Sequence, residues 1–194
     1  RYDMFEPSLE QVKKQFLRVR KAAAEIGEDG IQMYLGCELH SSMDMTDCLK
    51  KGERLTMSGS RYVLTEFRTS DEKSYIRERV QALIRKGYYP IIAHVERYRA
   101  VVDKKALVEE LIELGAWIQV DAGALLGEQG WKLKMISRRL LKNEQIHFIG
   151  SDAHDSQRRA PNLELCRSYV VKKMGEKYAQ ELFFGNPQAL LKKS

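Results

Sequence analysis

Short apolar runs alternate with longer amphipathic stretches along most of this chain, and this alternation restricts the fold more than any other feature of the sequence. The apolar runs are too short for typical helices, and most are rich in β-branched or aromatic residues. They fall at residues 31–35, 62–64, 90–93, 117–120 and 147–149. Near-continuous apolar character without alternation is typical of strands that are buried on both faces, so each run is predicted to be a strand of a parallel sheet.

Amphipathic helices of the length that a crossover needs are predicted between these strands, at residues 71–86, 103–114 and 129–142. A further helix is predicted to begin at Ser8, because Gln11 follows three residues later as in a capping box, and to end at Gly27. The segment from Cys166 to the end is predicted to be helical with a break at 185–187. This order indicates one α/β domain over residues 1–194, with a parallel sheet or a barrel of βα units.

Composition restricts the function classes. The net charge is +6, but the basic residues are scattered through the predicted helices, which favours a solvated surface over nucleic-acid binding. The three cysteines form no CxxC pair, which fits a reducing cytoplasm. No apolar run approaches the roughly 18 residues that a membrane-spanning helix needs, so no membrane insertion is expected.

Acidic and histidine side chains follow the predicted strands directly. They are Glu38, Glu66, His94, Asp121, and the pair Asp152 and His154. Because the carboxyl ends of parallel strands lie on one face of the fold, this pattern predicts a shared cleft. Taken alone, Glu66 and Asp121 are more typical of helix N-caps or loop hydrogen bonds, whereas the other four residues are expected to converge.

The chemistry of these residues indicates a metal site that binds a phosphorylated substrate. Asp152 and His154 stand two residues apart, so their side chains can point the same way and bind one ion or a pair of ions. Arg97, three residues after His94, has a planar guanidinium group that can bind two phosphate oxygens at once. Arg158 or Arg159 can supply a second such group. Carboxylate and imidazole ligands without thiolates favour manganese, iron or zinc over calcium.

The remaining histidines, aromatic residues and cysteines give weaker signals. His147 lies within a strand pattern and is expected to be structural, whereas His40 is left open between the two roles. Three aromatic residues are expected to serve packing: Tyr98, Trp117 and Trp131. No C-x5-R loop occurs, which argues against the cysteine nucleophile of thiol-based tyrosine phosphatases.

Six segments together resemble one known family: GCELH, GSRYVLTEF, GYYPIIAHVERYRA, LGAWIQVDAGALLGEQG, HFIGSDAHDSQRRAP and NPQALL. They resemble the metal-dependent tyrosine phosphatases of the polymerase-and-histidinol-phosphatase (PHP) superfamily, which act on bacterial tyrosine autokinases that control capsule or exopolysaccharide synthesis. The resemblance implies an irregular, distorted TIM-like β/α barrel. It also implies the metal ligands Glu38, His94, Asp152 and His154, and the phosphate-contacting residues Arg97 and either Arg158 or Arg159.

The resemblance further implies the cofactor and the reaction. Two or three divalent ions, with Mn²⁺ favoured and Fe or Zn as alternatives, would activate a water for in-line attack at phosphorus, without a covalent intermediate. A metal or His154 would assist the leaving tyrosyl oxygen. The partner would be a tyrosine autokinase that carries phosphotyrosine. The alternatives are another PHP phosphoesterase, such as a histidinol phosphatase, and a truncated binding module without catalysis.

The sequence differs from the family pattern at its N-terminus. The family opens with a strand bearing an HxH pair and with a second strand ending in another histidine, and RYDMFEP resembles the segment just after that third histidine. The domain is therefore expected to be N-terminally incomplete over residues 1–194, with weak metal binding and little turnover. An open barrel would also expose a sheet edge, which favours a homo-oligomer.

Overall fold

The computed structural model describes residues 7–26, 30–103 and 105–191. The expected likeness of residues 1–6 to a segment of the family, and the predicted helix end at Gly27, lie outside these residues.

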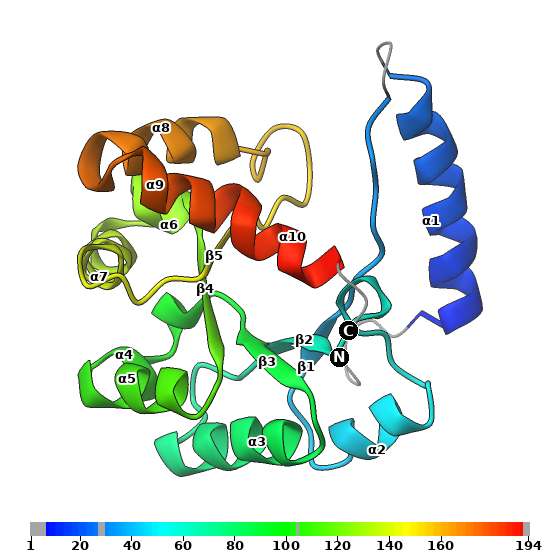
Figure 1. Ribbon diagram of the computed structural model, residues 1–194, viewed down its shortest axis with the longest axis horizontal. Coiled ribbons are helices and arrows are strands. Elements are labelled where there is room, and N and C mark those ends of the chain that lie inside the picture. The colour runs from blue at the N-terminus through cyan, green and yellow to red at the C-terminus, as the bar shows by residue number, and fades with distance from the viewer. Residues whose placement is uncertain (1–6, 27–29, 104, 192–194) are drawn as a thin grey trace.

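Five parallel strands form the sheet at the centre of the protein (Figure 1). They are β1 (Glu38–His40), β2 (Tyr62–Glu66), β3 (Tyr89–Ile92), β4 (Trp117–Asp121) and β5 (Phe148–Gly150). Each strand pairs with the next along the chain, in the order β1-β2-β3-β4-β5. This sequential order is that of barrel-type winding, because doubly wound sheets reverse direction at a switch point. The predicted parallel α/β fold is confirmed, and the described strands form an open sheet.

Helices α3 (Lys73–Arg85), α5 (Lys105–Glu113) and α7 (Trp131–Lys142) connect successive strands. Short helices α2 (Met45–Lys50), α4 (Arg99–Val102) and α6 (Ala122–Leu126) accompany them. In β4, the side chains of Ile118 and Val120 are fully buried in the hydrophobic core formed with α3, α4, α5, α6 and α7. The alternate residue Gln119 faces a cavity on the other side of the sheet. Strand alternation therefore separates a packed face from a face that is free to carry polar groups.

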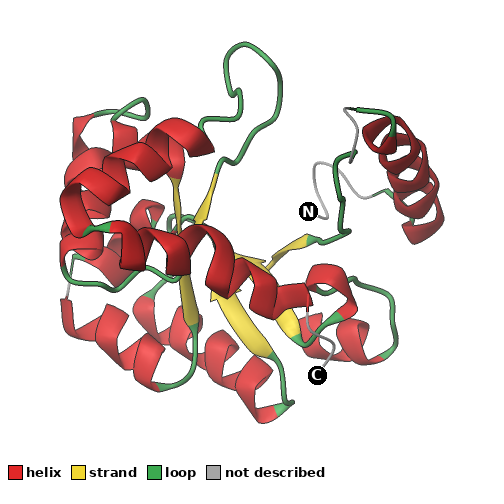
Figure 2. Ribbon diagram, turned by 45° about the horizontal axis from the view of Figure 1, so that its top comes forward, coloured by secondary structure: helices red, strands yellow, loops and turns green. Residues whose placement is uncertain are grey.

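The carboxyl-terminal helices are α8 (Leu163–Met174), α9 (Glu176–Gln180), the π-helical turn η3 (Glu181–Gly185) and α10 (Asn186–Leu191). Helix α10 passes in front of the strands in Figure 2, and its residues Pro187 and Leu190 line the same cavity as Gln119. The predicted helix break at 185–187 is wrong, because the chain remains helical from α9 into α10. The wider π turn before Pro187 provides the room that a proline ring needs.

Helix α1 (Leu9–Ala24) begins where the sequence predicts, because the Gln11 backbone N–H donates to Ser8 Oγ and the Ser8 N–H donates to Gln11 Oε1. However, the helix stands apart from the α/β body in both ribbon views (Figures 1 and 2). Ala23 is its only buried residue among those described. The apolar row along this helix therefore does not join the core.

Two further expectations need correction, and one is confirmed. The strand predicted at residues 31–35 is wrong: Ile31 and Tyr34 are each 53% exposed, and pairing with β2 begins only at Glu38. The helix predicted at residues 103–114 is confirmed as α5, and the short helix α4, which was not predicted, ends just before it. Trp131 is not a packing residue, because it is 75% exposed at the start of α7.

A matched pair of truncations separates core from surface leucines. Leu111 of α5 is fully buried and Leu17 of α1 is 62% exposed. Leu111→Ala should lower the free energy of unfolding by about 2–5 kcal/mol, because it leaves a cavity in the core. Leu17→Ala should change it by less than about 0.5 kcal/mol. Urea denaturation of both variants checks this, and equal losses would show that α1 packs against the body.

Candidate active site

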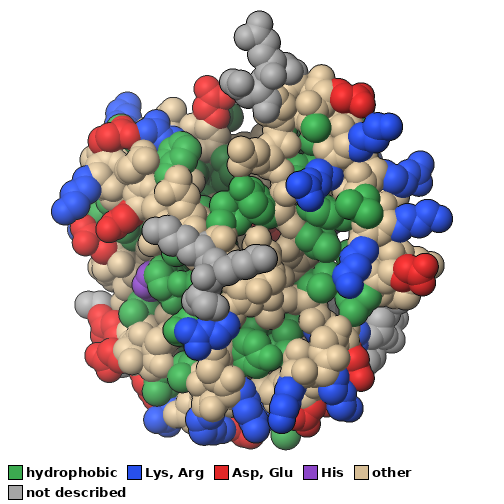
Figure 3. All heavy atoms as spheres, turned by 45° about the vertical axis from the view of Figure 1, so that its right-hand side comes forward, with side chains coloured by type: hydrophobic (Ala, Val, Ile, Leu, Met, Phe, Trp, Pro, Cys, Tyr) green, Lys and Arg blue, Asp and Glu red, His purple; other side chains and the backbone are tan. Residues whose placement is uncertain are grey.

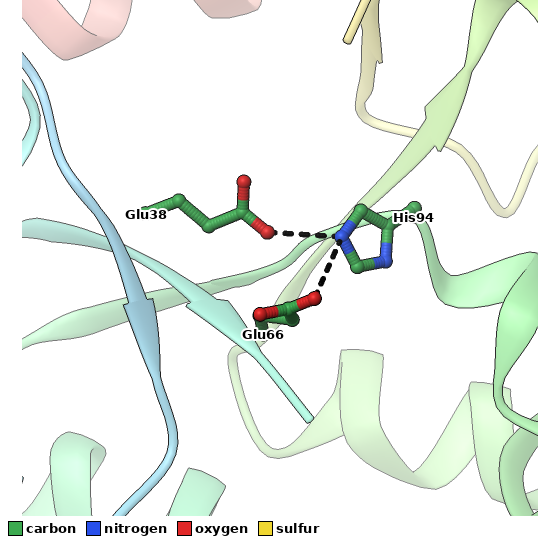
Figure 4. Close-up of side chains that lie close together, drawn as sticks. All are labelled: Glu38, Glu66 and His94. Atoms are coloured by element: carbon green, nitrogen blue, oxygen red, sulfur yellow. Dashed lines mark hydrogen bonds and ion pairs between the residues drawn. The ribbon is translucent and has the colours of Figure 1, made fainter. Parts of the chain in front are cut away.

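Two carboxylates and one imidazole meet beside β1 and the carboxyl ends of β2 and β3 (Figure 4). Glu38 Oε1 lies 2.9 Å from His94 Nε2, and Glu66 Oε1 lies 3.8 Å from the same nitrogen. One ligand atom from each of the three residues falls within 4.8 Å of the other two. We call Glu38, Glu66 and His94 the acidic cluster.

The parallel sheet positions each member of this cluster. Glu38 is the first residue of β1 and Glu66 is the last residue of β2. Ala93 separates His94 from the end of β3, and His94 has a left-handed backbone with φ of +34°. That conformation is uncommon outside glycine, and it is held here by the His94 backbone N–H, which donates to Gln119 Oε1 at 2.7 Å. Gln119 itself passes so close to Gly150 that a Cβ there would lie 2.7 Å from its Nε2.

The acidic cluster fits a divalent cation. Ligand atoms bound to one such ion lie about 2.0–2.2 Å from it, and the three groups are already close enough to reach a shared ion with small movements. Their chemistry is oxygen and imidazole nitrogen, which suits manganese, iron or zinc. Burial lowers the pKa of His94, but the hydrogen bond and charge of Glu38 outweigh it and raise the pKa overall. The site therefore already attracts positive charge.

Arginines and aspartates form a second group beside the acidic cluster. Arg97 donates from Nη2 to Asp121 Oδ2 at 2.5 Å and to Asp152 Oδ2 at 2.8 Å. Arg159 donates to the same Asp152 oxygen. We call Arg97, Asp121, Asp152 and Arg159 the arginine group. Asp152 also lies on the wall of a cavity of about 280 Å³ that Glu38 and His94 line, so the two groups share one space.

The expectation of a helix N-cap or a loop hydrogen bond has a different outcome for Asp121 and for Glu66. Asp121 occupies the N-cap position of α6 without a capping hydrogen bond, but it accepts from the loop side chain of Gln129 at 3.3 Å as well as from Arg97. Glu66 does not cap a helix either, because its carboxylate faces His94. Its position at a strand end was the signal that could have placed it in the site. No pattern in the sequence marked Gln119. Its hydrogen bond to the His94 backbone depends on the close approach of Gly150, which is distant in the sequence.

The structure separates the residues that the sequence expected to converge. Glu38 and His94 are in contact, and Asp152 shares their cavity but pairs with the two arginines. His154 is exposed, and its Nδ1 lies 2.8 Å from the backbone oxygen of Asp152. Arg158 and Arg159 both line a polar pocket of about 270 Å³ that also includes Arg97. Of the two, Arg159 is the one that bonds to Asp152.

The remaining histidines and the cysteines have other surroundings. Nδ1 of His147 accepts from the Ile118 backbone N–H, and its ring packs on Trp117, so it supports the sheet. His40 lies 3.4 Å from Glu66 Oε2, at the border of the acidic cluster. Burial raises the pKa of all three thiols, Cys37, Cys48 and Cys166, and that of Cys166 reaches about 12. None of them therefore has the lowered pKa of a reactive thiolate.

An open, sequentially wound parallel sheet with a carboxylate and imidazole cluster beside its strand ends places this protein among the α/β proteins with a candidate metal site. The comparisons with known proteins agree. The family model described as "Capsular polysaccharide synthesis, CpsB/CapC" matches residues 1–192. The chain belongs to this CpsB/CapC family, which confirms the resemblance found in the sequence.

Curated relatives and a solved structure give further detail. The tyrosine-protein phosphatase CpsB of Streptococcus pneumoniae is 32% identical over 98% of this chain and 80% of its own length. The putative tyrosine-protein phosphatase CapC of Staphylococcus aureus is 36% identical over 75% of this chain and 57% of its own. A structure from work on YwqE of Bacillus subtilis and CpsB, named there as metal-dependent tyrosine phosphatases, superposes with a TM-score of 0.87. It covers 97% of this chain and 75% of that chain, at 28% identity.

On the side where α1 lies, Lys and Arg side chains gather with few acidic ones among them (Figure 3). Helix α1 carries five exposed basic residues: Lys13, Lys14, Arg18, Arg20 and Lys21. None of the helices in the described part of the chain is both long and apolar enough to cross a bilayer.

Glu96 provides a test of the electrostatics beneath the site. It is 1% exposed and its Oε1 accepts the Asp121 backbone N–H, and burial together with the nearby Asp121 raises its pKa from 4.5 to about 8. The folded state then keeps a proton that the unfolded chain loses, so the free energy of unfolding should fall as the pH rises between these two values. Glu96→Gln should remove a slope of roughly 1 kcal/mol per pH unit.

Urea denaturation of metal-free protein from pH 5 to pH 8 measures this slope. Glu113→Gln is the control, because Glu113 is exposed on α5 and its replacement should leave the slope unchanged. An identical slope in the Glu96→Gln variant and the unaltered protein would contradict the raised pKa.

Proposed function

We propose that this protein is a metal-dependent protein-tyrosine phosphatase that hydrolyses phosphotyrosine on a bacterial tyrosine autokinase controlling capsule or exopolysaccharide synthesis. The main support is the acidic cluster lying beside the arginine group, around one shared cavity. A site for cations next to a site for phosphoryl oxygens is the arrangement that metal-assisted phosphate hydrolysis requires. The family and the names of its tyrosine phosphatases support the substrate class.

Glu38, Glu66 and His94 are proposed to hold the first divalent ion. Asp152 and His154 are proposed to serve a further ion, since Asp152 shares the cavity of the acidic cluster. Mn²⁺ is proposed as the native metal, with Fe and Zn as alternatives, on the basis of the oxygen and nitrogen ligands. When bound, such ions supply Lewis-acid activation of a water and charge neutralisation at phosphorus.

The two guanidinium groups of the arginine group, Arg97 and Arg159, are proposed to bind the phosphoryl oxygens. Although burial opposes the charge of Arg97, Asp121 and Asp152 raise its pKa, so the guanidinium stays charged in this half-buried place. Asp121 is fully buried and holds the guanidinium group of Arg97 in place through a hydrogen bond. Arg159 is held by Asp152 and faces the polar pocket. Both guanidinium groups can then meet an incoming dianion without reorganisation, which favours the transition state.

The sequential strand order supports one more structural proposal. We propose that the sheet belongs to the irregular β/α barrel of the superfamily, because each strand of such a barrel pairs with its successor.

Hydrolysis of p-nitrophenyl phosphate and of a phosphotyrosine peptide tests the function. Any hydrolysis of either substrate should require a divalent ion, with Mn²⁺ as the most effective one, and thiol alkylation should leave the rate unchanged. Glu66→Gln should lower metal affinity by about 10–100-fold, because it removes a charged ligand. Glu164→Gln, an exposed change on α8, should have no effect.

Three outcomes would contradict this proposal. Activity that survives chelation and is lost on alkylation would indicate a thiol mechanism. A strong preference for histidinol phosphate over the peptide would indicate a different PHP phosphoesterase. Tight binding of the phosphopeptide without any turnover at saturating metal would indicate a binding module.

Neighbouring arginines provide a second test. Arg159→Ala should lower kcat/KM for the aryl phosphate by about 100-fold, because Arg159 lies on Asp152 and faces the phosphoryl site. Arg158→Ala makes the same change in charge one residue away and should leave kcat/KM nearly unaltered. Steady-state kinetics at saturating metal compares the two, and equal losses would show that only the positive charge of this loop matters.

A further inference from the structure

We propose that Tyr98 is a positioning residue of the metal centre: its hydroxyl oxygen accepts a hydrogen bond from the Nδ1–H of His94 and so directs the Nε2 lone pair at the cation. This inference rests on the metal centre of the proposed function. Tyr98 is 1% exposed, and its aromatic ring by itself would qualify it only as a packing residue.

The hydroxyl of Tyr98 joins two parts of the acidic cluster. Its oxygen lies 3.0 Å from His94 Nδ1 and accepts the Phe67 backbone N–H at 3.1 Å. Phe67 directly follows Glu66 at the end of β2. One oxygen atom therefore links the ring of one proposed ligand to the backbone beside another.

The two ring nitrogens of His94 have different roles when a cation is bound: Nε2 binds the cation and Nδ1 carries the proton. Nε2 faces the carboxylates of Glu38 and Glu66, so a cation shared by the three residues would take the lone pair of Nε2. The ring proton must then reside on Nδ1, and His94 is only 4% exposed, so water cannot readily accept it. The Tyr98 oxygen lies in the place where a metal-bound histidine needs a hydrogen-bond acceptor.

Packing holds the Tyr98 ring independently of its hydroxyl. The ring meets Phe67 edge to face, with centroids 5.9 Å apart, and also contacts the His94 ring at 5.7 Å. Tyr98→Phe would keep these contacts and remove one oxygen atom. The variant therefore tests the hydrogen bond with little disturbance of the core.

Tyr178 supplies a matched control. Its hydroxyl also reaches a backbone group, since it donates to the Ile146 oxygen at 2.9 Å, but its ring belongs to α9 and lines neither pocket of the site. Tyr98→Phe and Tyr178→Phe each remove one bonded hydroxyl from the protein. Only the first should alter the metal centre.

Calorimetric titration of the metal-free proteins with Mn²⁺ decides between the roles. Tyr98→Phe should weaken the Kd by about 10–100-fold, the range found for residues that orient metal ligands. Tyr178→Phe should leave the Kd unchanged. If the two variants and the unaltered protein all bind Mn²⁺ equally, the positioning role is wrong while the proposed function stands. If the unaltered protein binds no metal, both fail.

A measurement on the unaltered protein makes the test independent of how the variant folds. Nitrogen-15 labelling of the four histidines, followed by NMR with Zn²⁺ bound, reports which ring nitrogen of His94 holds the proton. We expect a protonated, slowly exchanging Nδ1 and a metal-bound Nε2. A proton on Nε2 would overturn the assignment.

Discussion

Parallel pairing of consecutive strands is the constraint on which the rest of this structure depends. Because β1 to β4 run in the same direction in sequential order, the ends of β2, β3 and β4 fall at one edge of the sheet. Glu66, His94 and Asp121 come from segments far apart in the chain, yet all three stand at these strand ends. Ile92 of β3 and Ile118 and Val120 of β4 pack into the core on the opposite face, so alternation along the strands separates the main core from the cavity that carries the site.

Pairing of opposite charges then determines how the polar side chains at the strand ends are arranged. Asp121 is fully buried, and a buried carboxylate is costly unless a positive partner is present, which Arg97 supplies. Arg97 in turn reaches Asp152, which Arg159 also contacts. In the acidic cluster, His94 contacts both Glu38 and Glu66, and His40 contacts Glu66 from the border of the cluster. A site that is balanced at one end and acidic at the other suits a cation and an anion bound side by side.

Local sequence rules succeeded where local forces dominate. The capping box at Ser8 is present, and four of the five predicted strands occur within one or two residues of their expected positions. They failed where the outcome depends on distant partners. Residues 31–35 have strand-like composition, but a strand exists only where a neighbour pairs with it, and β2 offers its edge to residues 38–40. Likewise the proline at 187 predicted a break that the π turn before it avoids.

The sequence by itself determined the fold class, the spacing of the strands and the residue types at their ends, because periodicity and strand-end chemistry are local properties of the chain. It also carried the family resemblance through segments such as AHVERY and SDAH. Only the tertiary structure decided that Glu66 faces His94, that Arg159 rather than Arg158 contacts Asp152, and that the Tyr98 hydroxyl meets an imidazole nitrogen. These contacts depend on side-chain directions across separate strands and loops, which residue spacing along one chain does not specify.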